Sequence, residues 1–207
     1  MFRDREDAGT QLAQKLKAYH GTEAVVLALP RGGVVIGERV AAELSLPLDI
    51  VVTRKIGHPT NPEYAICAVD ERGTRLCNEA ELKHIDKKWF NQRVVQEQQE
   101  AQRRIALYRG KKAPISISGK TAIIVDDGIA TGLTIRLAIK AVKEQKPMRV
   151  VVAVPVTPSD VAMKIKREAD ELVVLESPEN FLGAVGAHYR FFPQVEDPEV
   201  IRLLSLI

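Results

Sequence analysis

Cysteine and aromatic residues are scarce in this 207-residue sequence, which has two cysteines and only 5% phenylalanine, tryptophan and tyrosine. Cys67 and Cys77 form no CxxC pair and stand apart from the four histidines, so a structural zinc site is not expected. If residues 71–73 form a three-residue hairpin loop, with Gly73 in the left-handed conformation, the two cysteines face each other across the strands. We interpret them as a pair of reduced thiols.

Long hydrophobic runs are also missing. No segment approaches the ~20 apolar residues of a membrane span, and the charged start, MFRDRED, leads into no apolar segment. We therefore expect a cytoplasmic protein with no membrane partner. The net charge of +3 suits an anionic small molecule. No tract of Lys and Arg typical of nucleic-acid binding occurs, so no nucleic-acid partner is expected.

The sequence does contain a regular alternation of short apolar runs and amphipathic stretches. This alternation predicts an α/β fold: an open, mostly parallel sheet of about five strands with helices on both faces, in one domain spanning residues 1–207. Expected strands cover residues 24–29, 48–54, 120–127, 149–156 and 171–176, and expected helices cover residues 4–19, 34–45, 79–109, 131–145, 158–168 and 198–206.

Two segments depart from this pattern. Residues 96–104, QEQQEAQRR, belong to the expected long helix but are polar on all sides, which predicts that they are solvated or packed on a partner subunit of a homodimer. Residues 177–193 concentrate aromatic side chains between the last strand and the last helix. We expect them to form a small hood, with contributions from the N-terminal helix.

Ligands of open parallel sheets bind at the carboxyl ends of the strands. Four segments of interest follow expected strands, so they should meet at that edge and form one site. They are residues 29–33 (LPRGG), 53–63 (TRKIGHPTNPE), 125–132 (VDDGIATG) and 154–158 (VPVTP).

Residues 128–134, GIATGLT, predict a phosphate-binding loop. Its glycines permit a tight turn, Thr131 and Thr134 offer hydroxyls, and a helix beginning at about Thr131 directs its free N–H groups at the loop. Leu133 stands where a Walker loop requires lysine, so the loop is of another kind.

Two adjacent acids, Asp126 and Asp127, precede this loop. Neighbouring strand residues point to opposite faces, so the pair would not chelate as a simple fork unless the strand has ended. Hydrogen bonds to two neighbouring hydroxyls, such as the diol of a ribose, fit the pair well. The alternative is that both acids only cap the next helix, but a buried like-charged pair is costly without a ligand or cation.

These residues carry a resemblance to a known family. The stretch AIIVDDGIATGLT, residues 122–134, resembles the phosphoribosyl-pyrophosphate signature of the type I phosphoribosyltransferases. LPRGG resembles their pyrophosphate loop, and TRKIG, residues 53–57, opens the position of their flexible catalytic loop. The resemblance covers nearly the whole chain and is greatest to the xanthine and related purine enzymes and to bacterial phosphoribosyltransferases of unassigned substrate.

The resemblance implies a transferase of nucleotide metabolism. It would move ribose 5-phosphate from phosphoribosyl pyrophosphate to a nitrogen acceptor, a nucleobase or small amine, and release pyrophosphate. It assigns ribose binding to Asp126 and Asp127, 5-phosphate binding to Gly128, Ile129, Ala130, Thr131, Gly132 and Thr134, pyrophosphate binding to Arg31, Gly32 and Gly33, and base stacking to Phe181. Arg54 and Lys55 are further candidate cations, and Asp126, Asp127, Arg31 and Lys55 are the expected catalytic residues.

The resemblance also implies a cofactor and two backbone features. Mg²⁺ would be held largely through the substrate, with Asp126 or Asp127 as the candidate protein ligands. The peptide bond between Pro30 and Arg31 is expected to be cis. Residues 56–63, rich in glycine and proline, should lack regular structure and close over the substrate as a flexible-loop hairpin.

Other interpretations stay open. A module that binds phosphoribosyl pyrophosphate or a nucleotide without transferring anything would be a regulatory protein, and a Mg²⁺-dependent phosphohydrolase would use the acidic pair differently. His58 is a further candidate for a general base. One residue departs from the 6-oxopurine enzymes: Ala130 stands where they carry a third acid, so hypoxanthine and guanine are expected to be poor substrates.

Overall fold

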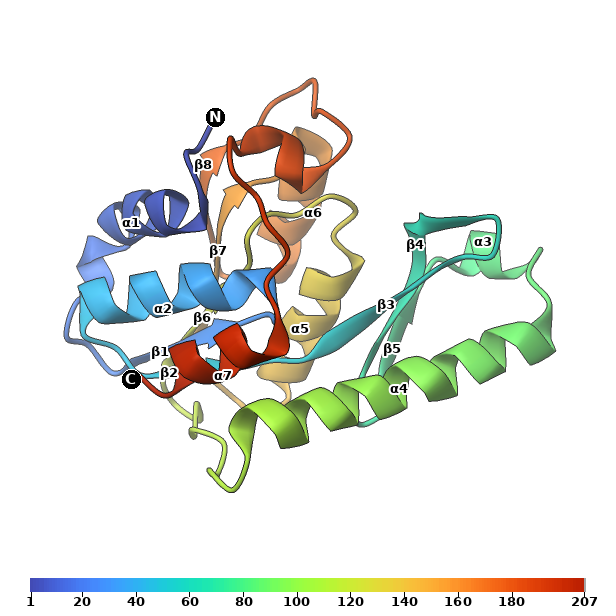
Figure 1. Ribbon diagram of the computed structural model, residues 1–207, viewed down its shortest axis with the longest axis horizontal. Helices are drawn as coiled ribbons and strands as arrows, with labels where there is room; N and C mark the ends of the chain where they lie inside the picture. Colours follow the sequence, from blue (N-terminus) through green and yellow to red (C-terminus); the bar gives the residue numbers. More distant parts are fainter. Residues whose placement is uncertain (207) are drawn as a thin grey trace.

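The computed structural model describes residues 1–206, apart from the side chain of Glu63. Figure 1 shows a compact core with an arm extending from one side of it. The helices are α1 (Arg5–Lys15), α2 (Gly32–Leu44), α3 (Glu79–Leu82), α4 (Lys87–Arg109), α5 (Leu133–Lys143), α6 (Ser159–Glu168) and α7 (Asp197–Leu204), with short 3₁₀ turns η1 (Lys17–Tyr19) and η2 (Val185–His188). The strands are β1 (Ala24–Ala28), β2 (Leu48–Ile50), β3 (Thr53–His58), β4 (Asn61–Asp70), β5 (Arg75–Cys77), β6 (Thr121–Val125), β7 (Arg149–Val156) and β8 (Glu171–Glu176).

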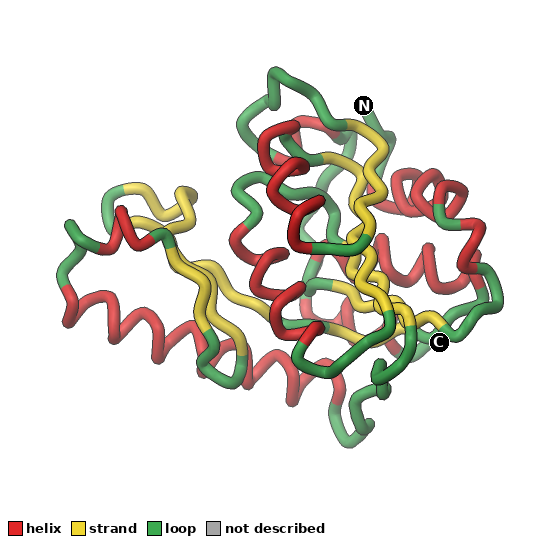
Figure 2. The backbone as a smooth tube through the Cα atoms, turned by 180° about the vertical axis from the view of Figure 1, so that it is seen from behind, coloured by secondary structure: helices red, strands yellow, loops and turns green. Residues whose placement is uncertain are grey.

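The core is a parallel sheet of five strands in the order β2-β1-β6-β7-β8. Its central strands are buried throughout, as expected for apolar strands covered on both faces. One hydrophobic cluster joins the sheet to α1, α2 and α7, and a second joins the other face to α5 and α6. Figure 2 shows the sheet edge-on between these helical layers. The predicted α/β class and the parallel sheet of about five strands are confirmed.

The arm consists of a second sheet, β3-β4-β5, packed on α4. Its strands are antiparallel, and Ile56, Ile66 and Val94 lie in its small core. The sheet contains most of the segment that the sequence suggested would lack regular structure: residues 56–58 and 61–63 lie in β3 and β4. The hairpin itself was expected, but the irregular lid was wrong, because the strand pairing satisfies the backbone on both sides of its turn.

Three other expectations about the arm need correction. The strand expected over 48–54 is split, because the chain leaves the main sheet after Ile50 and re-pairs from Thr53. The helix expected over 79–109 is two helices, with Asp86 capping the second by accepting a hydrogen bond from the Trp89 N–H. Cys67 and Cys77 are opposite each other in β4 and β5, as predicted, but they are joined as a disulfide rather than reduced.

The polar half of α4 is also not solvated on all sides. Glu97 is only 8% exposed and accepts bonds from Arg54 of β3 and Arg93, while Gln98 and Gln102 donate to the Glu71 carbonyl. Its polar side chains therefore serve contacts within this chain. Among residues 1–206, no helix has the length and apolar character needed to cross a membrane.

Candidate active site

The two adjacent acids lie directly after β6, at the carboxyl edge of the main sheet. Because β6 ends at Val125, Asp126 and Asp127 are free of the strand's alternation. The LPRGG segment, which follows the neighbouring strand β1, packs against them. A Cβ added to Gly32 would overlap the Asp127 carboxylate, and one added to Gly33 would lie 3.0 Å from Asp126 Oδ1. The structure therefore brings the predicted ribose and pyrophosphate segments into contact.

Asp127 is held by residues from both ends of the chain. Arg5, in the first turn of α1, donates from Nε to Asp127 Oδ2 at 2.8 Å, and its Nη1 donates to the Pro193 carbonyl at 2.7 Å. The Arg5 guanidinium also stacks 3.6 Å from the centre of the Phe192 ring. Tyr189 donates its hydroxyl to the Asp127 carbonyl at 2.5 Å. The first helix and the hood thus fix the position of the acidic pair.

Burial changes the titration of both acids. Removal from water, and then the neighbouring Asp127 charge, raise the pKa of Asp126 well above its usual range. Burial also raises the pKa of Asp127, but the charge and hydrogen bond of Arg5 oppose this. Asp127 is therefore the member of the pair that is stabilised as an anion.

The predicted phosphate loop lies between this pair and α5. The helix begins at Leu133, two residues later than expected, with Gly132 as its N-cap at φ +83°. Only glycine is readily accommodated there, since a Cβ would also lie 2.8 Å from Val161. Within the described part of the chain, the N–H groups of Ala130, Thr131 and Gly132 make no hydrogen bond. They lie at a helix N-terminus, which favours anions.

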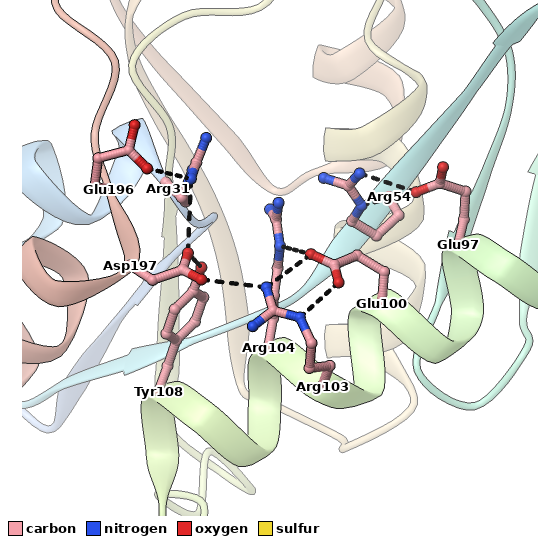
Figure 3. Close-up of polar contacts among 9 residues, drawn as sticks. All are labelled: Arg31, Arg54, Glu97, Glu100, Arg103, Arg104, Tyr108, Glu196 and Asp197. Atoms are coloured by element: carbon pink, nitrogen blue, oxygen red, sulfur yellow. Dashed lines mark hydrogen bonds and ion pairs between the residues drawn. The ribbon is translucent and has the colours of Figure 1, made fainter.

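Arg31 follows a cis peptide bond from Pro30, as the sequence predicted. Its side chain, however, is engaged with acids of the C-terminal helix: Nη1 donates to Glu196 Oε2 at 3.1 Å and lies 3.7 Å from Asp197 Oδ1. Figure 3 shows this contact. An anion that binds to Arg31 would therefore compete with the acids at the start of α7.

Arg54 and Lys55 lie on opposite faces of β3. Arg54 faces α4 and donates from Nε and Nη2 to Glu97 Oε2, both at 2.9 Å. Lys55 is exposed and shares a strand face with Thr53, whose hydroxyl donates to the Thr134 carbonyl at 3.4 Å. Arg54 is thus on the face of β3 turned toward α4, and Lys55 is on the face that Thr53 turns toward α5.

Phe181, the expected stacking residue, lies in the hood but already has an aromatic partner. Its ring stacks on His188 with centroids 4.9 Å apart. Ring stacking by Phe181 with a ligand stays a prediction.

Sequence reasoning missed Arg5 and Tyr189. Arg5 lies in a charged stretch that shows only a helix start, and Tyr189 lies in an aromatic-rich segment with several equivalent candidates. Nothing in the local pattern of either residue indicates a contact with Asp127. We expected the N-terminal helix to contribute to the hood, but the sequence did not indicate which of its residues does so.

A family profile described as "Phosphoribosyl transferase domain" matches residues 3–191. The chain belongs to the phosphoribosyl transferase family. The match contains both the LPRGG segment and the acidic pair with its loop, which are the segments that meet at the carboxyl edge of the sheet.

Individual members of this family align with nearly the whole of this chain, but the share of their own length that is covered differs. The crystal structure of TT1426 from Thermus thermophilus is 38% identical, with a TM-score of 0.80, and the alignment covers 98% of this chain and 97% of that one. Two Mycobacterium tuberculosis proteins, each named "Putative phosphoribosyl transferase" (Rv0571c in strain H37Rv, MT0597 in strain CDC 1551), are 42% identical over 207 residues. That alignment covers 99% of this chain and 46% of theirs, so the chain spans about half the length of these curated relatives.

A more distant structure shares the fold. The purine phosphoribosyltransferase from Pyrococcus horikoshii Ot3 is 18% identical, with a TM-score of 0.50, and the alignment covers 93% of this chain and 89% of that one. At this identity the likeness concerns the arrangement of the α/β core. It does not identify an acceptor for this chain.

The donor groups at the site suit a hard cation held mostly by substrate. Among residues 1–206, no cluster of three or more His, Cys, Asp or Glu side chains forms a metal cage. Asp126 and Asp127 offer carboxylate oxygens, the ligand type that Mg²⁺ prefers. Two carboxylates leave most of the coordination shell to substrate oxygens and water, which fits the expected cofactor.

Proposed function

We propose that this protein transfers ribose 5-phosphate from phosphoribosyl pyrophosphate to a nitrogen acceptor and releases pyrophosphate. The observation that carries the proposal is the direct packing of Gly32 and Gly33 on Asp126 and Asp127. It brings a candidate pyrophosphate loop and a candidate ribose-binding pair together beside a phosphate loop. A donor with a phosphate, a ribose diol and a diphosphate has its groups in that order.

The phosphate loop would bind the 5-phosphate. The N–H groups of residues 128–132 and the hydroxyls of Thr131 and Thr134 supply donors, and the N-terminus of α5 adds a favourable dipole. Asp126 and Asp127 would accept hydrogen bonds from the two ribose hydroxyls. Arg5 keeps Asp127 charged and oriented for this task.

In the transfer step, the bond between the anomeric carbon and a pyrophosphate oxygen breaks, and a bond from that carbon to the acceptor nitrogen forms. The electron pair of the broken bond leaves with pyrophosphate. Positive charge builds up on the ribose, so the protein's main contribution is to stabilise the departing anion and to exclude water. Arg31, Lys55 and the backbone of Gly32 and Gly33 would contribute to the first of these.

Asp126 or Asp127 would hold Mg²⁺, which would supply positive charge to stabilise the departing pyrophosphate. The β3–β4 hairpin would close over the bound donor, since it lies beside α5 and extends from the site. The nitrogen acceptor would enter beneath the hood formed by residues 177–193. We also propose a cytoplasmic location and a homodimer for the protein.

The test is incubation of the full chain with phosphoribosyl pyrophosphate, Mg²⁺ and a panel of nucleobases and small amines, with pyrophosphate release as the readout. Acceptor-dependent release would support the transferase. Tight binding of the donor without release for any acceptor would instead indicate a regulatory module, and release that needs only water would indicate a hydrolase.

A further inference from the structure

Arg103 and Arg104, neighbours in α4, both donate hydrogen bonds to Glu100, but they do so with different numbers of guanidinium nitrogens. Arg103 donates to both oxygens of Glu100, at 2.7 and 3.0 Å, and to Asp197 Oδ2 at 3.2 Å, and its side chain is 51% exposed. Arg104 is only 11% exposed and donates from Nε alone, to Glu100 Oε1 at 2.7 Å. Within the described part of the chain, no residue accepts a bond from the two terminal nitrogens of Arg104.

The unused end of Arg104 points toward the predicted pyrophosphate-binding arginines. In Figure 3 its guanidinium rises from α4 between Arg31, on the left, and Arg54, on the right. Burial and a hydrogen bond to Asp197 raise the pKa of Tyr108 to about 12, and the charges of Arg104 and Arg31 both oppose that shift. Two arginines from distant elements therefore act on one hydroxyl, as expected if their charges are close in space.

Arg31, Arg54 and Arg104 each bond to their carboxylate partners through only some of their guanidinium nitrogens. Arg31 bonds through Nη1 to the start of α7, and Arg54 bonds through Nε and Nη2 to Glu97 of α4. Each guanidinium carries five N–H donors, so each keeps donors beyond these ion pairs. In Figure 3 the terminal nitrogens of Arg104 point away from α4, and the nitrogen of Arg54 that has no dashed line points to the side on which Arg104 lies.

This arrangement is costly as a purely structural network. Guanidinium charges that lie close together repel one another, which disfavours their grouping when no anion is bound. The Arg103 and Arg104 guanidiniums hold the pKa of Glu100 at about 2, so Glu100 stays ionised, but Arg103 already binds both of its oxygens. The terminal fork of Arg104 is therefore not required to satisfy Glu100.

A diphosphate group has the negative charge and the acceptor oxygens that the remaining N–H donors of the three arginines can bind. Its oxygens carry several negative charges and accept two-pronged hydrogen bonds from guanidinium groups. Arg31 follows β1, Arg54 lies in β3 and Arg104 lies in α4, so one anion would be held from three elements. Such a site would also connect the arm to the core when the donor binds.

We infer that Arg31, Arg54 and Arg104 form one diphosphate-binding site, and that Arg104 binds the diphosphate of the donor and of the product. The inference rests on the proposed function, because it identifies the anion as the diphosphate of that reaction. Arg104 comes from a polar helix that no sequence motif connects with the site.

Calorimetry with Mg²⁺-pyrophosphate tests this inference on the full chain. Arg104→Gln should lower the affinity about tenfold or more, because a charge-assisted, two-pronged contact is lost. Arg104→Lys, which keeps the charge but lacks the fork, should fall between the wild type and Arg104→Gln. Arg93→Gln is the matched control, since Arg93 makes an equivalent pair with Glu97 four residues along the same helix; it should leave the affinity within about twofold.

Ribose 5-phosphate serves as the second probe. Its phosphate should bind the loop at residues 128–134, so Arg104→Gln should bind it as the wild type does, which also shows that the variant is folded. Equal pyrophosphate affinity of the wild type and both Arg104 variants would overturn the inference and leave the proposed function standing. Loss of pyrophosphate binding in Arg104→Gln, with no transfer by the wild type to any acceptor, would support the site and overturn the function. A wild type that does not bind pyrophosphate would overturn both.

Discussion

Arg5 and Asp127 form an ion pair across the site, with Arg5 Nε 2.8 Å from Asp127 Oδ2 and both side chains largely buried. The pair joins the first helix to the end of the central strand β6. It also places a permanent positive charge beside a group that would otherwise protonate more easily. Asp127 therefore owes both its position and its charge to a residue 122 positions away.

Replacing Arg5 by glutamine should weaken binding of phosphoribosyl pyrophosphate by about tenfold to about a hundredfold, because Asp127 loses a charged hydrogen-bond partner worth roughly 1.5 to 3 kcal/mol. Arg5→Lys should recover part of the loss. The neighbouring Arg3 is the control: its side chain is exposed and pairs with Asp4, away from Asp127, so Arg3→Gln should bind like the wild type. Calorimetry on all four proteins, with thermal unfolding to check the fold, makes the comparison. Equal binding by Arg5→Gln would show that Arg5 only holds the hood in place.

Asp127→Asn should leave the fold intact but weaken donor binding, at a cost of roughly 1.5 to 3 kcal/mol, because a ribose hydroxyl loses a charged acceptor. Binding of inorganic pyrophosphate should change much less, since the diphosphate contacts other residues. Calorimetry with the two ligands separates these effects. If the variant and the wild type bound the donor alike, Asp127 would have no role in ribose recognition.

Asp126 should destabilise the unliganded protein as it ionises. Its pKa is raised in the folded state, chiefly by burial, so the folded form holds the proton more tightly than the unfolded chain does. The free energy of unfolding should therefore fall as the pH rises from about 4 toward neutrality. Asp126→Asn should remove this fall and raise Tm at pH 7, by about 2–4 °C for each kcal/mol gained. A Tm at pH 7 that drops in the variant would contradict the argument.

The five-stranded core could be predicted from the sequence because each of its strands is a short apolar run between amphipathic helices. Strands that are buried on both faces, such as β1 and β6, are apolar at nearly every position and are therefore easy to recognise. The acidic pair and both loops were found for a similar reason, since each is a local motif at a strand end. Arg5, Tyr189 and Arg104 were not found, because their contacts depend on how distant segments pack. Cys67 and Cys77 show the same limit: their register was predictable from the turn, but their bond was not.

Glu196→Gln should strengthen binding of Mg²⁺-pyrophosphate by up to about fivefold, because Glu196 now competes for Arg31 and an exposed pair of this kind contributes roughly 0.2 to 1 kcal/mol. Glu199, another acid in the first turn of α7, makes no ion pair with Arg31. Glu199→Gln is therefore the control for a general loss of negative charge. Calorimetry at low and moderate salt should show the gain only for Glu196→Gln, and it should shrink as salt screens the pair. Equal gains in both variants would indicate a general charge effect instead of competition for Arg31.

Ala130 predicts which acceptors this protein uses. It is exposed at the start of the phosphate loop, where the 6-oxopurine enzymes that the sequence resembles carry an acid that handles the proton of the incoming purine nitrogen. A methyl group cannot take that proton, so the acceptor should be another base, or a small amine already deprotonated when it binds. Values of kcat/KM for hypoxanthine, guanine, xanthine, adenine, uracil and orotate decide this, and hypoxanthine and guanine should be at least about a hundredfold poorer than the best acceptor, the lower end of what a general acid or base contributes. Ala130→Asp should raise the rate with hypoxanthine if the missing acid is the cause. Efficient turnover of hypoxanthine or guanine by the wild type would mean that another group in the site accepts the proton.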